Sequence, residues 1–255
     1  MNLFLHGAED FNIVRGDTLR QPAFVSGDRL ATFDCVIANP PFSLKAWGEE
    51  AWASDPWGRN IAGTPPKGYG DWAWVQHMIS SMAPKSGRLA VVLPHGALFR
   101  MGAEGKIRSK VIDLDLIEAV IGLGPNLFYG TTIPAYVLVC RQKKTKDRLG
   151  KILLVDGSEI FQRGRNQNTL EAEHVVALYD AYKNFSDVDG LSKVVTTDEV
   201  RDQDGNLNIT AYVSKINDEV IPSVEEATAA LKAALDSAWA AEDALNKLLI
   251  EMGIS

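Results

Sequence analysis

The chain contains few cysteines and histidines, which limits the kinds of site that it can build. Its 255 residues include two cysteines, Cys35 and Cys140, and each lies within an apolar run typical of a strand. We therefore expect two buried, reduced thiols in a cytoplasmic protein, and no disulfide framework. The four histidines lie far apart in the sequence without the spacing of metal ligands, so we expect no metal site.

Long apolar runs and an excess of positive charge are also missing. No run reaches the length of a membrane span and the N-terminus lacks a signal-peptide pattern, so we expect no membrane association. The formal net charge of −7 argues against a chain that coats nucleic acid by itself. Lysines and arginines do gather within residues 141–151, but such a run is more typical of a solvated loop than of a phosphate contact.

The apolar residues that are present predict an α/β fold. With 46% hydrophobic residues, the chain can bury the core of one large domain, or of one domain with a small appendage. Apolar residues at helical spacing predict a helix over 71–82, and a flexible basic loop over 102–110 leads to a further helix. Short apolar runs predict strands at 11–14, 33–38, 88–93, 116–123 and 133–140, the last two as a closely spaced pair.

The most informative stretch joins the apolar run at 33–38 to Asn39-Pro40-Pro41-Phe42. The run resembles a buried strand, and the two prolines remove backbone donors and end it. Pro40 keeps Asn39 out of the helical region, so an amide and an aromatic ring are presented at a stiff turn. In open α/β sheets, ligands bind at this edge. The alternative is a purely structural turn, with Asn39 capping it and Phe42 filling the core.

This turn resembles the catalytic motif of amino-group DNA methyltransferases, in which Asp, Asn or Ser precedes two prolines and an aromatic residue. The resemblance implies that Asn39 and the Pro40 carbonyl accept hydrogen bonds from the amino group of a target adenine, with Pro41 completing the turn. Accepting both hydrogens localises the nitrogen lone pair while the methyl group is transferred. Phe42 then stacks on the base that has left the duplex.

Two further segments take roles from the same resemblance. Asp17, after the strand predicted at 11–14, corresponds to the acidic residue that contacts the adenine of S-adenosylmethionine, the methyl donor. The segment before the last predicted strand supplies a second ring against the flipped base, which makes Phe128 or Tyr129 a candidate.

Residues 43–72 are rich in Gly, Pro and Trp. Two interpretations fit this segment equally well: a flap over the substrate, and a surface loop with a small aromatic cluster.

Longer strings narrow the resemblance to the modification (M) subunit of type I restriction–modification systems, an adenine-specific DNA methyltransferase. The strings are NPPFS at 39–43, FYGTTIP at 128–134, GRNQN at 164–168 and NLNITAY at 206–212. They imply an incomplete Rossmann-like methyltransferase mixed sheet with a C-terminal helical extension. They also imply double-stranded DNA as substrate, and as partners the specificity (S) subunit, the restriction (R) subunit and, as a further candidate, a second M subunit.

The resemblance divides the chain into three parts. Residues 1–150 correspond to strands 3 to 7 of the catalytic domain, residues 151–215 to a family-specific extension, and residues 216–255 to a helix for subunit contact. Within the extension, the Arg and Asn side chains of 164–168 either contact phosphate or fix a loop, and we favour the structural role.

The C-terminal part carries a heptad pattern. Ser223 and Glu226 form a capping box directly after Pro222, and apolar residues then recur every seven positions from Val224 to Met252. The companion positions are mostly alanines, which makes the seam narrow. Such a helix packs either on its own domain or, as the family parallel favours, beside helices of the specificity subunit.

One part of the family pattern is missing. The family has a helical N-terminal region and an Asp-Pro-x-Cys-Gly-x-Gly-type loop that holds S-adenosylmethionine, and neither is in this sequence. We therefore predict a C-terminal fragment with an open apolar strand edge and an incomplete donor site, which binds the donor poorly and turns over little by itself. The other interpretations are a non-catalytic module that binds subunits or DNA, and a protein or RNA amino methyltransferase with the same motif.

Overall fold

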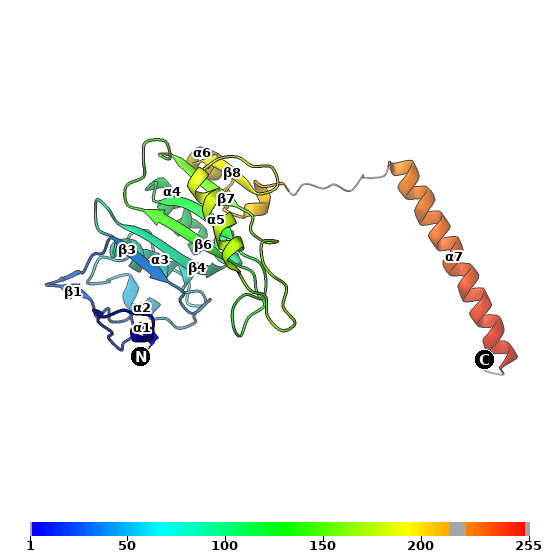
Figure 1. Ribbon diagram of the computed structural model, residues 1–255, viewed down its shortest axis with the longest axis horizontal. Helices are drawn as coiled ribbons and strands as arrows, with labels where there is room; N and C mark the ends of the chain where they lie inside the picture. The colour runs from blue at the N-terminus through cyan, green and yellow to red at the C-terminus, as the bar shows by residue number, and fades with distance from the viewer. Residues whose placement is uncertain (1, 215–222, 253–255) are drawn as a thin grey trace. The chain divides into compact units, whose positions relative to one another are not determined.

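The computed structural model describes residues 2–214 and 223–252 (Figure 1). Contacts divide the chain into two compact units, residues 1–215 and residues 216–255. The first unit contains a six-stranded sheet with its helices, and the second contains one long helix. No helix in the described ranges is both long and apolar enough to cross a membrane.

A mixed sheet forms the centre of the first unit (Figure 1). Its strands lie in the order β3-β4-β6-β5-β7-β8. β3, β4, β5 and β7 are parallel to one another, and β6 and β8 run the opposite way. The α/β mixed sheet is therefore confirmed, with the predicted hairpin as β5 and β6. The strands are β3 (Cys35–Ala38), β4 (Arg88–Pro94), β5 (Ile117–Gly122), β6 (Ala135–Arg141), β7 (Lys151–Val155) and β8 (Ser192–Thr196).

Helices cover both faces of this sheet, which gives three layers. α3 (Asp71–Ser80) and α4 (Ala103–Asp113) share one core with β4 and β6, in which Trp72 is fully buried. α5 (Ala172–Asn184) contributes Leu178 to a second core with β5 and β7. β5 is buried along its whole length, as expected for a strand that is covered on both faces.

Short elements complete the first unit. They are α1 (Asn2–Leu5), the hairpin strands β1 (Val25–Ser26) and β2 (Arg29–Leu30), α2 (Glu49–Trp52), α6 (Thr197–Asp202), and the 3₁₀ helices η1 (His95–Leu98) and η2 (Ile209–Ala211). Because β6 is antiparallel to β4, the end of β4 and the start of β6 lie at the same edge of the sheet, as does the end of β3. The candidate site lies at this edge.

β3 is an edge strand, which agrees with the predicted open apolar strand edge but not with the buried strand that its own apolar residues predicted. It pairs with β4 on one side, Ile37 is 76% exposed, and Cys35 is exposed where a buried thiol was expected. That prediction was wrong because the burial of a strand depends on neighbours that its own residues do not reveal. Cys140 lies in β6 between two strands and is buried as predicted, and burial raises the pKa of its thiol to about 12.

Two other sequence predictions were wrong. Residues 11–14 form no strand and leave Ile13 67% exposed, since an apolar run becomes a strand only when another strand pairs with it. The basic stretch predicted as a loop at 102–110 is mostly helix α4. Arg108 is fully buried there, where its Nε donates to the carbonyl of Gly205 and its Nη1 to the carbonyls of Ala97 and Arg100. These bonds partly compensate the cost of burying its charge.

The second unit is the 28-residue helix α7 (Val224–Glu251). The predicted capping box is present: Ser223 Oγ accepts from the Glu226 N–H, and the Glu226 side chain accepts from the Ser223 N–H. None of its residues is buried, and Leu231 and Leu245 on the predicted seam are 61% and 56% exposed. Pro222, which was expected to precede the cap, lies outside the described residues.

Candidate active site

The turn after β3 presents the Asn-Pro-Pro-Phe motif at the edge of the sheet. Pro40 is buried and Phe42 is half-buried, while Asn39 is exposed. The Asn39 amide forms no hydrogen bond with the part of the chain that the structure describes, so its oxygen is available to a ligand. The four motif residues line a hollow of about 590 Å³, which also includes Pro94 at the end of β4.

Aromatic residues from a distant loop form the other side of this hollow. Phe128, Tyr129 and Ile133 line it, and the Phe128 ring lies 6.1 Å from the Phe42 ring at an interplanar angle of 71°. This edge-to-face arrangement is favourable for aromatic pairs. Tyr129 is 94% exposed and extends beyond the pair. Both predicted rings therefore line the same hollow as the motif, with Phe128 against Phe42 and Tyr129 at the rim.

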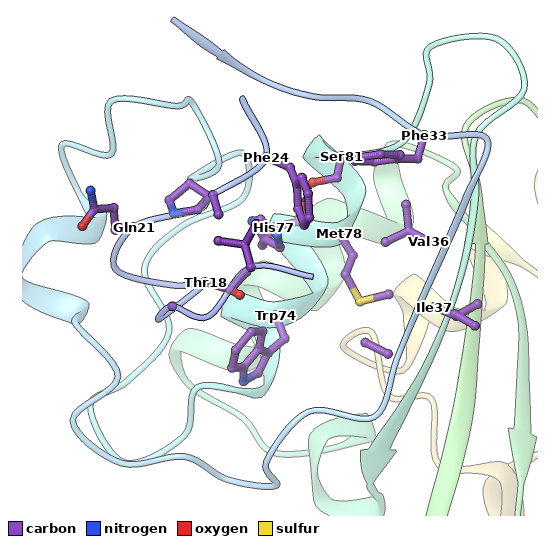
Figure 2. Close-up of a pocket in the computed structure, with 15 residues that line it drawn as sticks. Thr18, Gln21, Phe24, Phe33, Val36, Ile37, Trp74, His77, Met78 and Ser81 are labelled. Carbon is purple, nitrogen blue, oxygen red and sulfur yellow. Dashed lines mark hydrogen bonds between the residues drawn. The ribbon is translucent and has the colours of Figure 1, made fainter. Parts of the chain in front are cut away.

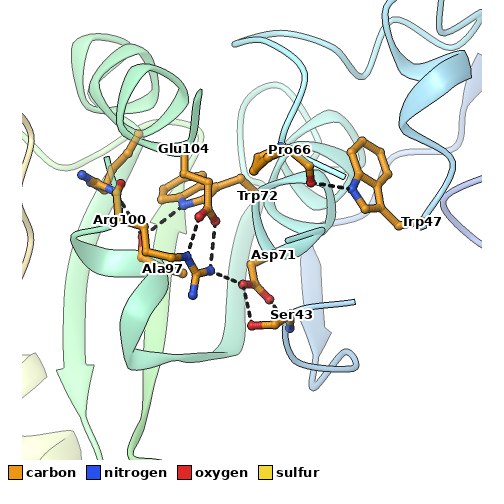
Figure 3. A network of polar contacts seen from close by, with 9 residues as sticks. Ser43, Trp47, Pro66, Asp71, Trp72, Ala97, Arg100 and Glu104 are labelled. Atoms are coloured by element: carbon orange, nitrogen blue, oxygen red, sulfur yellow. Dashed lines mark hydrogen bonds and ion pairs between the residues drawn. The ribbon is translucent and has the colours of Figure 1, made fainter. Parts of the chain in front are cut away.

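A buried polar network supports the turn from behind (Figure 3). Ser43, the residue after the motif, has a left-handed φ of 49°, and its N–H donates to Asp71 Oδ1 at 2.7 Å. Asp71 is fully buried at the start of α3 and forms an ion pair with Arg100, which also pairs with Glu104. Burial raises the pKa of the Glu104 carboxyl, and Arg100 opposes that rise. The network ties the turn to α3 and α4.

Sequence reasoning missed this network. Asp71 precedes the apolar pattern of α3 and so reads as an ordinary polar residue at the start of a helix. Arg100 and Glu104 lie far from it in sequence, Arg100 on the connection into α4 and Glu104 in the first turn of α4. Only the structure reveals that Ser43 has a left-handed conformation, which a β-carbon disfavours and which needs support from its surroundings. Backbone angles of this kind cannot be read from a residue type.

Asp17 lies apart from this hollow. It is on an exposed turn, where its Oδ1 accepts the N–H groups of Leu19 and Arg20, both at 3.1 Å. The segment is held by Arg59, which is 1% exposed and donates to the carbonyls of Thr18 and Leu19 at 2.9 and 2.8 Å. Asp17 is thus not brought together with the motif, although its turn is firmly anchored.

Arg59 also organises the Trp-rich segment. It forms an ion pair with Asp55 and lies 4.8 Å from the ring centroid of Trp52. Trp52 and Trp47 are each 2% exposed, and their rings meet edge to face at 5.2 Å. Trp47 in turn donates to the Pro66 carbonyl. Trp47 and Trp52 are therefore core residues. Of the two interpretations of residues 43–72, this burial favours the small aromatic cluster over the flap.

A second, apolar cavity of about 340 Å³ lies between β3, α3 and residues 14–24 (Figure 2). Phe24, Phe33 and Met78 line it, and its lining includes both neighbours of Asp17 in the chain, but not Asp17 itself. Ala38 lines this cavity and the next residue, Asn39, lines the hollow, so the end of β3 separates the two. Within the described ranges, no group of three or more His, Cys, Asp and Glu side chains is placed to hold a metal ion.

Comparison with known proteins gives a consistent set of matches. Residues 1–220 match the family described as N-6 DNA Methylase. The chain is 39% identical over 230 residues to the type I restriction enzyme MjaVII methylase subunit of Methanocaldococcus jannaschii, covering 86% of this chain and 39% of that protein. It is 31% identical over 237 residues to the HindI methylase subunit of Haemophilus influenzae, covering 89% of this chain and 52% of that protein.

Solved structures agree with these matches. A type I restriction-modification methyltransferase subunit from Streptococcus thermophilus superposes with a TM-score of 0.77 at 33% identity, over 84% of this chain and 45% of that one. The chain thus spans about two fifths to half of the length of these relatives.

Proposed function

The chain belongs to the N-6 DNA Methylase family, and from that premise we propose that its hollow is the methyl-transfer site of a type I restriction–modification methyltransferase subunit. The substrate in this proposal is an adenine in double-stranded DNA, and the donor is S-adenosylmethionine. The observation that carries the proposal is that Asn39, Phe42, Phe128 and Tyr129, which come from two distant segments, line one hollow at the edge of the sheet.

The chemistry assigned to the turn follows from two acceptor-bearing residues that line the hollow, Asn39 and Pro40. Asn39 Oδ1 and the Pro40 carbonyl accept the two hydrogens of the adenine amino group, which concentrates the lone pair on nitrogen for attack on the methyl carbon. As the nitrogen–carbon bond forms, the methyl–sulfur bond would break, and its electron pair would stay on sulfur in the departing neutral thioether. Phe42 and Phe128 pack against the extruded base, whose unstacking costs a few kcal/mol. After transfer, the methylated nitrogen releases one proton to solvent through the open hollow. No side chain with a tuned pKa is required for this reaction.

The residues around the apolar cavity fit one end of the methyl donor. Its aromatic and aliphatic walls suit a purine ring, and the carboxylate of Asp17, 56% exposed beside it, can accept a hydrogen bond from an amino group or hydroxyl. When bound, S-adenosylmethionine supplies an electrophilic methyl group. Ala38 and Asn39 connect this cavity to the hollow, so the end of β3 is the part of the chain that both ligands would approach.

The proposed partners are the specificity and restriction subunits and a second modification subunit. α7 supports a helical partner, because its apolar seam is exposed along the helix. A non-catalytic role in binding subunits or DNA remains the alternative, and methyl transfer distinguishes the two.

The test is transfer of labelled methyl groups from S-adenosylmethionine to duplex DNA by the full chain in its native assembly, followed by nucleoside analysis. The expected product is N6-methyladenine, with no label on cytosine, RNA or protein. Label on RNA or protein in place of DNA would support the other amino methyltransferases, and no label at all would support the non-catalytic module.

A further inference from the structure

The GRNQN segment forms a rigid loop beside the proposed target-base hollow. The loop begins and ends at Gln162 and Thr169, which exchange two backbone hydrogen bonds of 2.9 and 3.0 Å. Gly164 is required for its tight path, because a β-carbon there would lie 1.9 Å from the Gln167 carbonyl oxygen. The Asn168 side chain closes the loop by accepting from the Gly164 N–H at 3.3 Å.

The amide side chains also fix this loop to the aromatic loop that follows β5. Gln167 Nε2 donates to the Leu127 carbonyl at 2.9 Å, and Asn168 Nδ2 donates to the Pro125 carbonyl at 2.8 Å. Asn126 Nδ2 donates in the opposite direction, to the Asn166 carbonyl, at 3.0 Å. These bonds hold the loop against the segment that carries Phe128 and Tyr129.

The two arginines of the loop have no such role. Arg163 and Arg165 are exposed, and neither forms an ion pair or hydrogen bond through its side chain with the described residues. The nearby acid Glu171 is engaged at the start of α5, where it accepts from Thr169 and takes part in a capping box. The loop therefore presents two guanidinium groups on a fixed backbone, and no carboxylate in the described part of the chain forms an ion pair with them.

The surface next to these arginines continues the hollow. A second hollow of about 640 Å³ shares Phe128, Tyr129 and Ile133 with the first and has Asn166 and Gln167 in its lining. The aromatic loop therefore lies between the motif and the GRNQN loop. Arg165 directly precedes Asn166 in the chain, which places it at the border of the second hollow.

We propose that Arg163 and Arg165 form a phosphate-binding site for the DNA strand that carries the target base, with the neighbouring nucleotide in the second hollow. This assignment rests on the proposed function. Arginine is suited to phosphate because its planar guanidinium donates two parallel hydrogen bonds. In a chain of net charge −7, a rigid pair of unneutralised arginines provides local attraction that the surface as a whole does not.

The test measures the binding of duplex DNA to the full chain in its native assembly as a function of salt. Removing one arginine–phosphate interaction reduces the slope of log binding constant against log salt by about 0.9. We expect Arg163→Ala and Arg165→Ala to weaken binding at low salt by about three- to tenfold each, and the double variant to reduce the slope by about 1.8. Arg163→Lys and Arg165→Lys retain the slope, because the charge is kept.

The control is Arg29→Ala on β2, another exposed arginine without an ion pair among the described residues, which leaves the slope unchanged. Thermal unfolding of every variant stays at the unmodified midpoint, since these side chains hold nothing in place. An unchanged slope in the double variant overturns the proposal. The proposal is also overturned if the arginines affect the binding of duplex RNA but not the binding of duplex DNA. DNA binding does not require methyl transfer. Arginine-dependent binding without methyl transfer would therefore refute the proposed reaction and leave the phosphate-binding site supported.

Discussion

At the scale of single residues, the polar side chains behind the motif determine how the turn is held. The Asp71 carboxylate accepts a hydrogen bond from the N–H of Ser43, a non-glycine residue in the left-handed region. Arg100 balances the charge of Asp71. Left-handed backbone costs an L-residue about 1–2 kcal/mol, so the turn depends on this support. Asp71 is thus a positioning residue for the Asn-Pro-Pro-Phe motif.

Replacing Asp71 by asparagine tests this role. Asp71→Asn keeps the shape but leaves Arg100 with one carboxylate instead of two, and we expect a loss of about 1–3 kcal/mol of unfolding free energy. We also expect methyl transfer at saturating DNA to fall by about tenfold or more, while DNA affinity changes little, because a misplaced turn affects the reacting atoms. Asp28→Asn on the exposed hairpin is the control. A loss confined to stability, with full activity in the folded fraction, would show a merely structural role.

His77 makes the stability of the first unit depend on pH. Its Nδ1 lies 3.4 Å from Arg59 Nη1, and burial together with the Arg59 charge lowers the pKa of the imidazole to about 4. The unfolded chain, with a pKa near 6.5, therefore takes up the proton first as the pH falls. The stabilisation is complete above about pH 6.5 and is lost progressively towards pH 4.

Urea unfolding at pH 7 and pH 4.5 measures this effect. The His77 contribution to the loss of unfolding free energy between the two is about 2–3 kcal/mol. His77→Gln removes the titrating group. Between pH 7 and pH 4.5 the variant should therefore lose about 2–3 kcal/mol less unfolding free energy than the unmodified chain. Equal losses in the two proteins would show that carboxylates alone account for the acid sensitivity.

At the scale of elements, α7 carries its apolar seam along a single 28-residue helix. Its cap is well formed, but no residue on it is buried. In proteins, most of the stability of a helix comes from packing of its apolar face and not from intrinsic helix propensity. The seam of leucines and alanines is narrow enough for a closely packed helix, as in a coiled coil.

Changing the seam tests whether α7 binds the proposed specificity subunit. Leu231→Asp and Leu245→Asp should each weaken assembly with that subunit by about ten- to a hundredfold, because each leucine contributes about 1.5–3 kcal/mol when buried. Lys247→Ala on the same helix is the control. Light scattering of the mixed subunits gives the mass of the complex. Full-sized complexes from both aspartate variants would contradict the assignment.

At the scale of the whole molecule, local patterns predicted the parts of the fold that local interactions determine. Alternating and helical apolar spacing placed β4, β5, β6 and α3 within a few residues of their observed bounds. The failures are all non-local: Cys35 is exposed because β3 has one neighbour, and Arg108 makes α4 a core helix through the carbonyl of Gly205, 97 residues away.

The candidate site likewise has a part that short sequence strings predicted and a part that depends on contacts between distant residues. The motif and the ring at Phe128 were predicted from short strings typical of a family, and they line one hollow. Asp71 and Arg59 were not predicted as supporting residues, since their roles depend on partners brought near by the fold. Of the two roles expected for the side chains of 164–168, the structural one holds for the amides, which fix the loop. It does not hold for Arg165, whose side chain contacts none of the described residues through a hydrogen bond or ion pair.

The role proposed for Asn39, holding the amino group of the target adenine, is tested by the single-turnover rate of methyl transfer with Asn39→Ala. At saturating donor and DNA, we expect a rate lower by about 10²–10³-fold with DNA binding retained, because one acceptor at the reacting atom is removed. The control is Asn184→Ala, at an exposed asparagine at the end of α5, which should transfer at the unmodified rate. An Asn39→Ala protein that methylates adenine at the unmodified rate would show that Asn39 does not hold the amino group.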